Sequence, residues 1–240
     1  MDRNESEEII MGDIKVTTEI DGAVIREEDR LRKELERARI ALALLKEAIG
    51  PDEMRRILKK HLDQGSADVM RWQQASGQGR KDSQTIIRVK GMKVAEFLDW
   101  FGKVNQQGNL ATLLAANPEH YLVRPYAKDG RKYQELIETM GMYGEPLHCI
   151  LEFPPSVPDA EQYLDSSYPY TMIATGTLAA NGEKIGIRAL HQFRDTEDGF
   201  EAKLLIQFPD HAPAELVQGH KMHLAIEFNN WIEAARQSLD

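Results

Sequence analysis

A histidine and a glutamate near the C-terminus are spaced so that both can reach one ligand. His223 and Glu227 stand four residues apart in a stretch whose apolar residues repeat with a helical period, so their side chains lie about 40° apart on one face. The apolar stripe contains Leu224, Phe228 and Trp231, and the pair runs along its flank. A carboxylate in that position needs a partner. Exposed surface pairs have this spacing too, so the pair indicates a metal site only if the rest of the chain supplies further ligands.

Two more side chains are predicted to reach the same point. His120 opens a predicted strand, and alternation over residues 147–153 puts Glu152 on one strand face together with His148. His120, Glu152, His223 and Glu227 form a donor set that zinc binds, and that iron or manganese would tolerate. Two alternatives stay open: His148 could replace His120, and His220 could be a ligand or donate a hydrogen bond to one.

The elements that must position these residues predict an α+β fold. Helical periodicity predicts helices over residues 93–104 and 132–140 and from about Ala214 onward, and alternation predicts strands over residues 83–89, 121–126, 147–153, 170–178, 184–193 and 200–208. The last strands share one apolar sheet face. We expect the long C-terminal helix to cover a curved antiparallel sheet there and to leave a cavity into which the four ligands point.

The N-terminal third reads as a separate helical segment. The turn signal at Asp21-Gly22 predicts a short β-hairpin. Residues 26–49 then form a predicted helix with a heptad seam, which comprises Leu31, Leu35, Ala38, Leu42, Leu45 and Ile49. Gly50-Pro51 ends this helix and a second helix follows, so we predict a helical hairpin. A polar, glycine-containing stretch over residues 66–81 predicts a linker. We therefore assign residues 1–78 to an oligomerisation element and residues 79–240 to the catalytic domain. The seam either forms a homodimer or packs on its own chain.

Composition excludes several classes of function. The net charge of −9 argues against nucleic acid as a partner, because phosphate binding requires a clustered basic surface. No apolar run is long enough to cross a membrane, and the N-terminus is acidic and polar. The single cysteine, Cys149, forms no internal disulfide. We expect a cytoplasmic protein.

Two segments resemble one enzyme family. Gly91-Met-Lys-Val-Ala-Glu-Phe-Leu-Asp-Trp-Phe101 followed by Ala116-Asn-Pro-Glu-His120 is similar to the 2,4-diacetylphloroglucinol hydrolase and phloretin hydrolase family, as is His223-Leu-Ala-Ile-Glu227-Phe-Asn229. The resemblance covers roughly residues 83–235. It implies a START-like helix-grip fold and a zinc site built from a histidine, a glutamate about thirty residues later, and a C-terminal His-x-x-x-Glu. His120 and Glu152 have that spacing.

The resemblance also implies a reaction, the hydrolysis of the carbon–carbon bond between an acyl group and a phloroglucinol-type ring. The substrate would be a small aromatic ketone. The leaving ring carbon must be protonated, so a proton donor is required. We predict His191 for this role, with Tyr143, Tyr126 and Tyr170 as weaker candidates. The alternative is a metal-free helix-grip module that binds an apolar aromatic or polyketide ligand.

Overall fold

The computed structural model describes residues 16–239, in two compact units that meet between Ala41 and Leu42. The first unit contains the hairpin β1 (Glu19–Ile20) and β2 (Ala23–Val24) and the start of helix α1 (Glu27–Ser76). The turn at Asp21-Gly22 has positive φ at both residues, which is the geometry that two-residue hairpin loops require. This hairpin confirms the sequence prediction.

The second unit is built on one antiparallel sheet of seven strands in the order β3-β9-β8-β7-β6-β5-β4. Its strands are β3 (Arg80–Lys90), β4 (His120–Lys128), β5 (Arg131–Glu138), β6 (Leu147–Glu152), β7 (Tyr170–Leu178), β8 (Lys184–Asp195) and β9 (Gly199–Pro209). Its other helices are α2 (Val94–Gln106), α3 (Leu110–Ala115), the 3₁₀ turn η1 (Glu161–Tyr163) and α4 (Ala214–Leu239).

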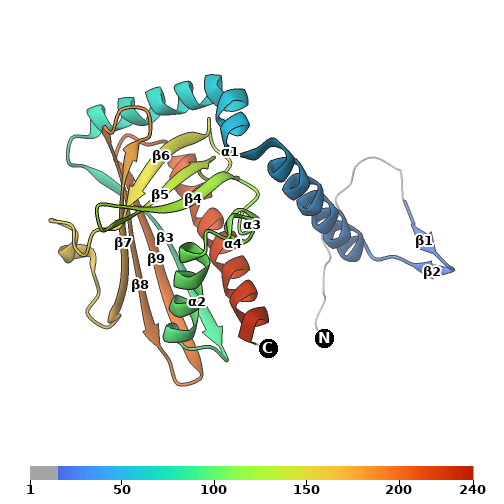
Figure 1. The fold of residues 1–240 in the computed structure, drawn as a ribbon. Coiled ribbons are helices and arrows are strands. Elements are labelled where there is room, and N and C mark those ends of the chain that lie inside the picture. Colours follow the sequence, from blue (N-terminus) through green and yellow to red (C-terminus); the bar gives the residue numbers. More distant parts are fainter. Residues whose placement is uncertain (1–15, 240) are drawn as a thin grey trace, which may run out of the picture. The chain divides into compact units, whose positions relative to one another are not determined.

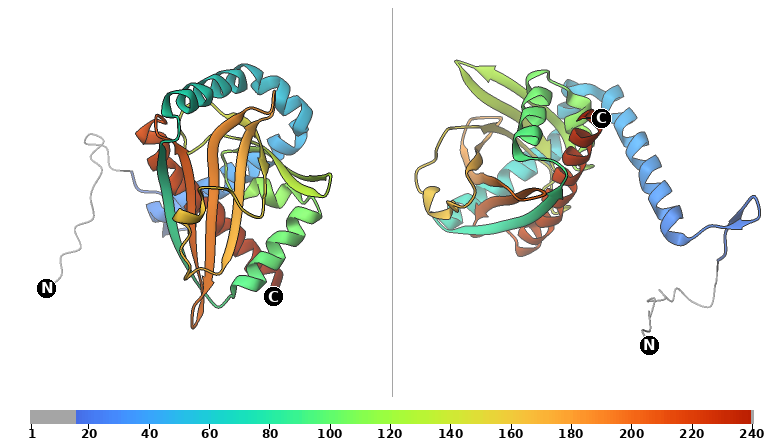
Figure 2. Two further views of the ribbon diagram at one scale, coloured as in Figure 1. Left: turned by 90° about the vertical axis from the view of Figure 1, so that its left-hand side faces the viewer. Right: turned by 90° about the horizontal axis from the view of Figure 1, so that it is seen from below.

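Helix α4 lies along the concave face of the sheet, with α2 beside it (Figures 1 and 2). Aromatic rings fill the space between them: Phe97 of α2 packs against Phe193, Phe200 and Phe228, and all four side chains are fully buried. Each contributes about 1.5–3 kcal/mol through the apolar area it removes from water. The predicted α+β helix-grip architecture is thus confirmed.

Helix α1 breaks where the sequence predicted, because Gly50 adopts φ 69° and ψ 170° inside it. The predicted linker over residues 66–81 is wrong for its first part, since α1 continues to Ser76. Val69 of this helix is fully buried in the main core, and Leu62 packs on the outward face of the sheet. The helix after Gly50 is therefore part of the sheet unit, and the structural division lies at residue 41 rather than 78.

A buried glutamate ties this part of α1 to the sheet. Glu135 on the outward face of β5 accepts hydrogen bonds from Arg55 of α1 at 2.7 and 2.9 Å, from Arg124 of β4, and from His148 of β6 at 2.8 Å. Burial raises the pKa of Glu135, but these three donors outweigh burial and hold the pKa at about 2.

The segment over residues 132–140 corrects another prediction, because it forms strand β5 and not a helix. A turn at Asp129-Gly130, with positive φ at both residues, joins β4 and β5 into an antiparallel pair. Strand alternation turns Gln134, Leu136 and Glu138 toward the concave face. None of the helices in the described residues 16–239 is long and apolar enough to cross a membrane.

Candidate metal centre

A cavity of about 90 Å³ lies between α4 and the concave face of the sheet. Most of its wall is apolar, with side chains such as Phe101, Leu151 and Met172. The polar lining side chains come from β4, β5, β8 and α4, and they are His120, Gln134, Glu138, His191, His220, His223 and Glu227.

The pairing of β4 with β5 brings a histidine and a glutamate together. His120 is the first residue of β4 and is in register with Glu138, the last residue of β5. Nε2 of His120 lies 3.4 Å from Oε2 of Glu138. Both side chains are largely buried, with 1% and 12% of their surfaces exposed.

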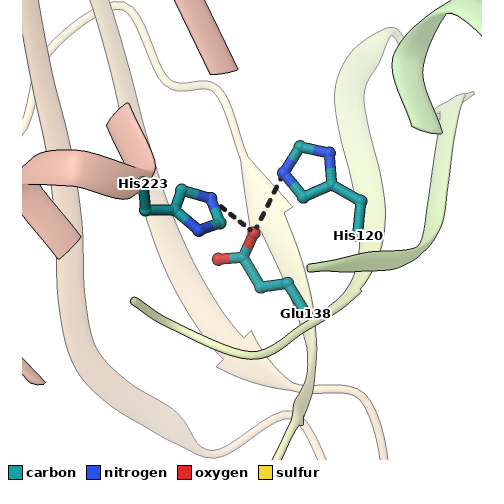
Figure 3. A group of neighbouring side chains, drawn as sticks. All are labelled: His120, Glu138 and His223. Carbon is teal, nitrogen blue, oxygen red and sulfur yellow. Dashed lines mark ion pairs between the residues drawn. The ribbon is translucent and has the colours of Figure 1, made fainter. Parts of the chain in front are cut away.

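Helix α4 supplies the other two side chains. Nε2 of His223 lies 3.5 Å from the same Oε2 of Glu138, and Oε1 of Glu227 lies 3.4 Å from Nε2 of His120. Figure 3 shows both imidazoles facing one carboxylate oxygen. Ligand atoms of His120, Glu138 and His223 all lie within 4.8 Å of one another, and Glu227 stands one helical turn beyond His223.

Hydrogen bonds fix which ring nitrogen each histidine presents. Nδ1 of His120 lies 3.2 Å from the carbonyl oxygen of Leu113, which only accepts, so Nδ1 carries the proton. Nδ1 of His223 pairs with Oε2 of Glu119 at 2.7 Å. Nε2 of both rings therefore faces the carboxylates, and Nε2 of His120 is buried without a hydrogen-bond partner among residues 16–239. Metal-binding histidines are oriented by their second nitrogen in this way.

The spacing of these atoms fits a metal better than direct hydrogen bonds. Charged N–H···O contacts are about 2.7–2.9 Å long, whereas the separations involving His120, Glu138, His223 and Glu227 are 3.4, 3.5 and 3.4 Å. Ligands about 2.0–2.1 Å from a tetrahedral zinc ion are about 3.3 Å apart. Two imidazoles with carboxylates are a donor set for zinc, and also for non-haem iron. The residues present therefore fit a divalent transition metal.

Burial and charge shift the pKa values of this group in the metal-free protein. Burial lowers the pKa of His120 to about 4 and raises that of Glu227 to about 8. Burial also lowers the pKa of His223, but Glu138 and Glu119 outweigh it and raise the pKa to about 10. Glu138 shows the converse, since the charge of His223 overcomes burial and holds its pKa at about 2. Without metal, His223 and Glu138 form an ion pair.

A close approach of two glycines holds the end of β5 against α4. A Cβ atom at Gly219 of α4 would lie 2.3 Å from the carbonyl oxygen of Gly141, and one at Gly141 would lie 2.4 Å from the backbone nitrogen of His220. No larger residue fits at this crossing without displacing backbone. Glu138, three residues before Gly141, is thereby held beside the helix that carries His223.

The structure does not bring Glu152 to this group. On β6 it is Leu151 that lines the cavity, so Glu152 points to the opposite face and accepts a hydrogen bond from Arg131 at 3.0 Å. His148 shares this outward face, where it binds Glu135. We assigned the correct alternation to β6 but chose the wrong face as the inward one. Glu138 takes the place predicted for Glu152.

Of the other candidate residues, His191 and His220 line the same cavity as the candidate metal ligands, and Tyr143 does not. His191 lines the cavity, and the backbone N–H of Leu205 donates to its Nδ1 at 3.2 Å. Burial lowers the pKa of His191 to about 3, so the ring is neutral with its proton on Nε2. His220 also lines the cavity and stacks on His223 at 4.9 Å; burial lowers its pKa to about 3. Tyr143 lines a separate cavity of about 190 Å³ instead.

Two site residues escaped the sequence analysis. Glu138 lies in a segment assigned to a helix, because Tyr133, Leu136 and Ile137 have helical spacing, although the Asp129-Gly130 turn signal precedes them. Glu119 belongs to the Ala116-Asn-Pro-Glu-His120 segment, but we predicted no role for it. Its carboxylate is the partner of His223, which no local pattern reveals because the two residues are far apart in sequence.

Comparison with known proteins finds similarity in structure and none in sequence. No protein-family model matches the sequence, and no curated protein does. Among solved structures, the crystal structure of Ara h 8.0201 matches with a TM-score of 0.44 and 12% identity, covering 66% of this chain and 99% of that one.

Proposed function

We propose that the protein is a metal-dependent hydrolase whose centre is held by His120, Glu138, His223 and Glu227. The observation that carries this proposal is Nε2 of His120, which is buried without a hydrogen-bond partner in the described chain and faces two carboxylates at 3.4 Å. Leaving a buried acceptor unpaired costs about 1–3 kcal/mol. A metal ion would satisfy this nitrogen together with Nε2 of His223.

The chain's own residues divide the remaining work. A bound divalent ion would polarise a carbonyl group and acidify water. Glu119 holds the ring of His223 in the orientation that presents Nε2. His191 is neutral, and its Nε2–H faces the cavity as a hydrogen-bond donor rather than as a strong acid. We therefore propose that His191 binds an oxygen of the substrate instead of acting as the general acid. The proton that the leaving ring carbon takes up would come from the attacking water, whose hydroxyl group goes to the acyl carbon.

For the substrate we propose an aryl ketone whose acyl group is cleaved from a phloroglucinol-type ring. The apolar wall of Phe101, Leu151 and Met172 suits an aromatic ring. Ligand sites usually measure about 300–1,000 Å³, whereas this cavity measures about 90 Å³. The cavity must therefore widen to bind a ring with an acyl chain. The longest acyl chain that the protein accepts would measure the extent of this widening.

Elemental analysis of the purified full chain tests the metal. We expect about one zinc or iron per chain, lost in EDTA and restored by the ion. Hydrolysis of acylphloroglucinols should disappear and return with the metal. Metal-free protein that cannot be loaded would refute the proposal.

The second candidate is a module that binds an apolar aromatic ligand without metal. It is favoured by the wall of the cavity, most of which is apolar. Tight binding of an acylphloroglucinol in EDTA, with no stoichiometric metal and no turnover, would establish this module in place of the hydrolase.

We also propose that the heptad seam forms a parallel homodimer. Leu31 and Leu35 are about half-exposed. The flanking heptad positions are acidic on one side and basic on the other, namely Glu27 and Glu34 against Arg32 and Arg39. In a parallel pair each acidic position meets a basic one, whereas an antiparallel pair brings like charges together. The charge pattern therefore favours two parallel copies.

A further inference from the structure

A buried tryptophan in the cavity has an indole N–H without an acceptor. Nε1 of Trp231 is buried and has no hydrogen-bond partner among residues 16–239, and only 6% of the residue is exposed. An indole nitrogen donates but cannot accept or bind a metal. A buried donor left unpaired is costly, so this position requires an oxygen or nitrogen atom that residues 16–239 do not supply.

Trp231 belongs to the same face of α4 as the candidate metal ligands. It follows Glu227 by four residues and His223 by eight, so the three side chains line one side of the helix. It lines the cavity, and its ring centroid lies 6.3 Å from that of His120. The ring that carries the unpaired donor therefore lies beside the candidate metal site and not in a remote part of the core.

The ring cannot turn to find another partner. Phe101 packs against it at a centroid distance of 4.9 Å, and Phe228 packs against it edge-on at 5.2 Å. Side chains in so closely packed a setting keep one rotamer. Phe101 and Phe228 thus set the direction of the N–H in the unliganded cavity.

We propose that Trp231 is a specificity-determining residue whose indole N–H donates a hydrogen bond to the carbonyl oxygen of a bound aryl ketone. The assignment rests on the proposed function, because the acyl group must lie at the metal, beside His120. A site with a fixed buried donor rejects a ligand that lacks the matching oxygen, since the donor then stays unpaired. Trp231 would select ketones over alkyl-substituted rings of the same shape.

Two ligands that differ by one oxygen test this role. The probes are 2,4,6-trihydroxyacetophenone and 2-ethylbenzene-1,3,5-triol, titrated in EDTA so that the ketone is not consumed. Full-length protein should bind the ketone about tenfold more tightly. Trp231→Phe, which keeps an aromatic ring and removes the donor, should lose this preference and bind the ethyl compound unchanged. A variant that keeps the preference overturns the proposal, as does wild-type protein that binds neither probe.

A spectroscopic measurement covers the case in which the variant does not fold. The chain has three tryptophans, so the indole region of an ¹⁵N spectrum contains three signals. Trp72→Phe and Trp100→Phe assign the signal of Trp231 by elimination. The ketone should move that signal downfield and leave the other two in place, whereas the ethyl compound should move none. An unmoved Trp231 signal at saturating ketone overturns the proposal.

The metal content separates this inference from the proposed function. If the protein holds no metal but Trp231 distinguishes the probes, the hydrolase fails and the hydrogen bond stands. If the protein holds metal and hydrolyses the ketone but Trp231→Phe keeps the preference, the hydrolase stands and the role of Trp231 fails.

Discussion

Replacing Glu138 by Gln should abolish metal binding, and replacing Glu152 by Gln should not. Oε2 of Glu138 lies 3.4 and 3.5 Å from the two imidazoles and is largely buried. Glu152 lies on the outward face of the sheet, 35% exposed, and pairs with Arg131. The two substitutions make the same chemical change, so any difference between them comes from position. This pair compares the structural assignment directly with the one that the sequence resemblance implied.

The expected effect follows from linkage between binding and folding. A ligand present at a hundred times its dissociation constant stabilises the folded state by about 2.7 kcal/mol. For a chain of this size each kcal/mol raises Tm by about 2–4 °C, so the ion should raise Tm by about 5–11 °C in the wild type and in Glu152→Gln. Glu138→Gln should show no increase.

Thermal unfolding with and without zinc, together with elemental analysis, provides the assay. The metal-free forms of both variants should give cooperative transitions, which shows that each is folded. The assignment fails if Glu138→Gln retains one metal per chain and the full increase in Tm, or if Glu152→Gln loses both.

Three further outcomes follow from the structure. Glu135→Gln should lower the free energy of unfolding at pH 7 by about 2 kcal/mol, less than for a fully buried ion pair because its partner Arg124 is half-exposed. The pKa of Glu135 is about 2 in the folded protein and about 4.3 in the unfolded chain, so this stabilisation is present above about pH 4.3 and is lost as the pH falls from there through 2. Denaturation of the wild type and the variant at pH 7 and pH 3 measures both effects. Gly219→Ala should cost about 2–3 kcal/mol and weaken metal binding by displacing backbone. Gly102→Ala, inside α2 with open space around it, should instead raise the free energy of unfolding by about 0.5–1 kcal/mol in the same urea titration, because Ala favours the helix over Gly. Glu34→Lys should dissociate the homodimer, because the new lysine would face Arg39 of the second copy, and adding Arg39→Glu should restore the dimer. Light scattering at two concentrations measures the oligomeric state. A monomeric wild-type protein would contradict the proposed dimer.

The candidate site divides clearly into what sequence can and cannot predict. His223 and Glu227 were predictable because both lie on one helix, where spacing alone fixes their relative position. His120 was predictable from its motif. Glu152 was assigned to the wrong face, because the expected ligand spacing was followed instead of the polarity of the strand. On β6 the fully apolar face with Cys149, Leu151 and Phe153 turns inward, whereas His148 and Glu152 lie on the outward face.

Glu138 shows a second limit of sequence reasoning. Its segment contains Tyr133, Leu136 and Ile137 among good helix formers, so the helical period competes with the strand period. Tertiary pairing with β4 decides between them. Glu119 and Trp231 show a third limit, because sequence patterns do not predict contacts between distant residues. Glu119 has its role because it pairs with His223, and Trp231 because its indole N–H has no partner among residues 16–239.

The charges at the site suggest why so many ionisable groups are tolerated in a buried cavity. In the metal-free protein at neutral pH, Glu138 is negative, His223 is positive and Glu227 holds a proton. A divalent ion bound as proposed would displace the protons of His223 and Glu227, so that the two charges of the ion would replace the two charges of the protons. The net charge of the cavity is therefore the same in both states. Burying a charge is expensive when it is uncompensated, and this exchange keeps the group compensated whether or not the metal is bound.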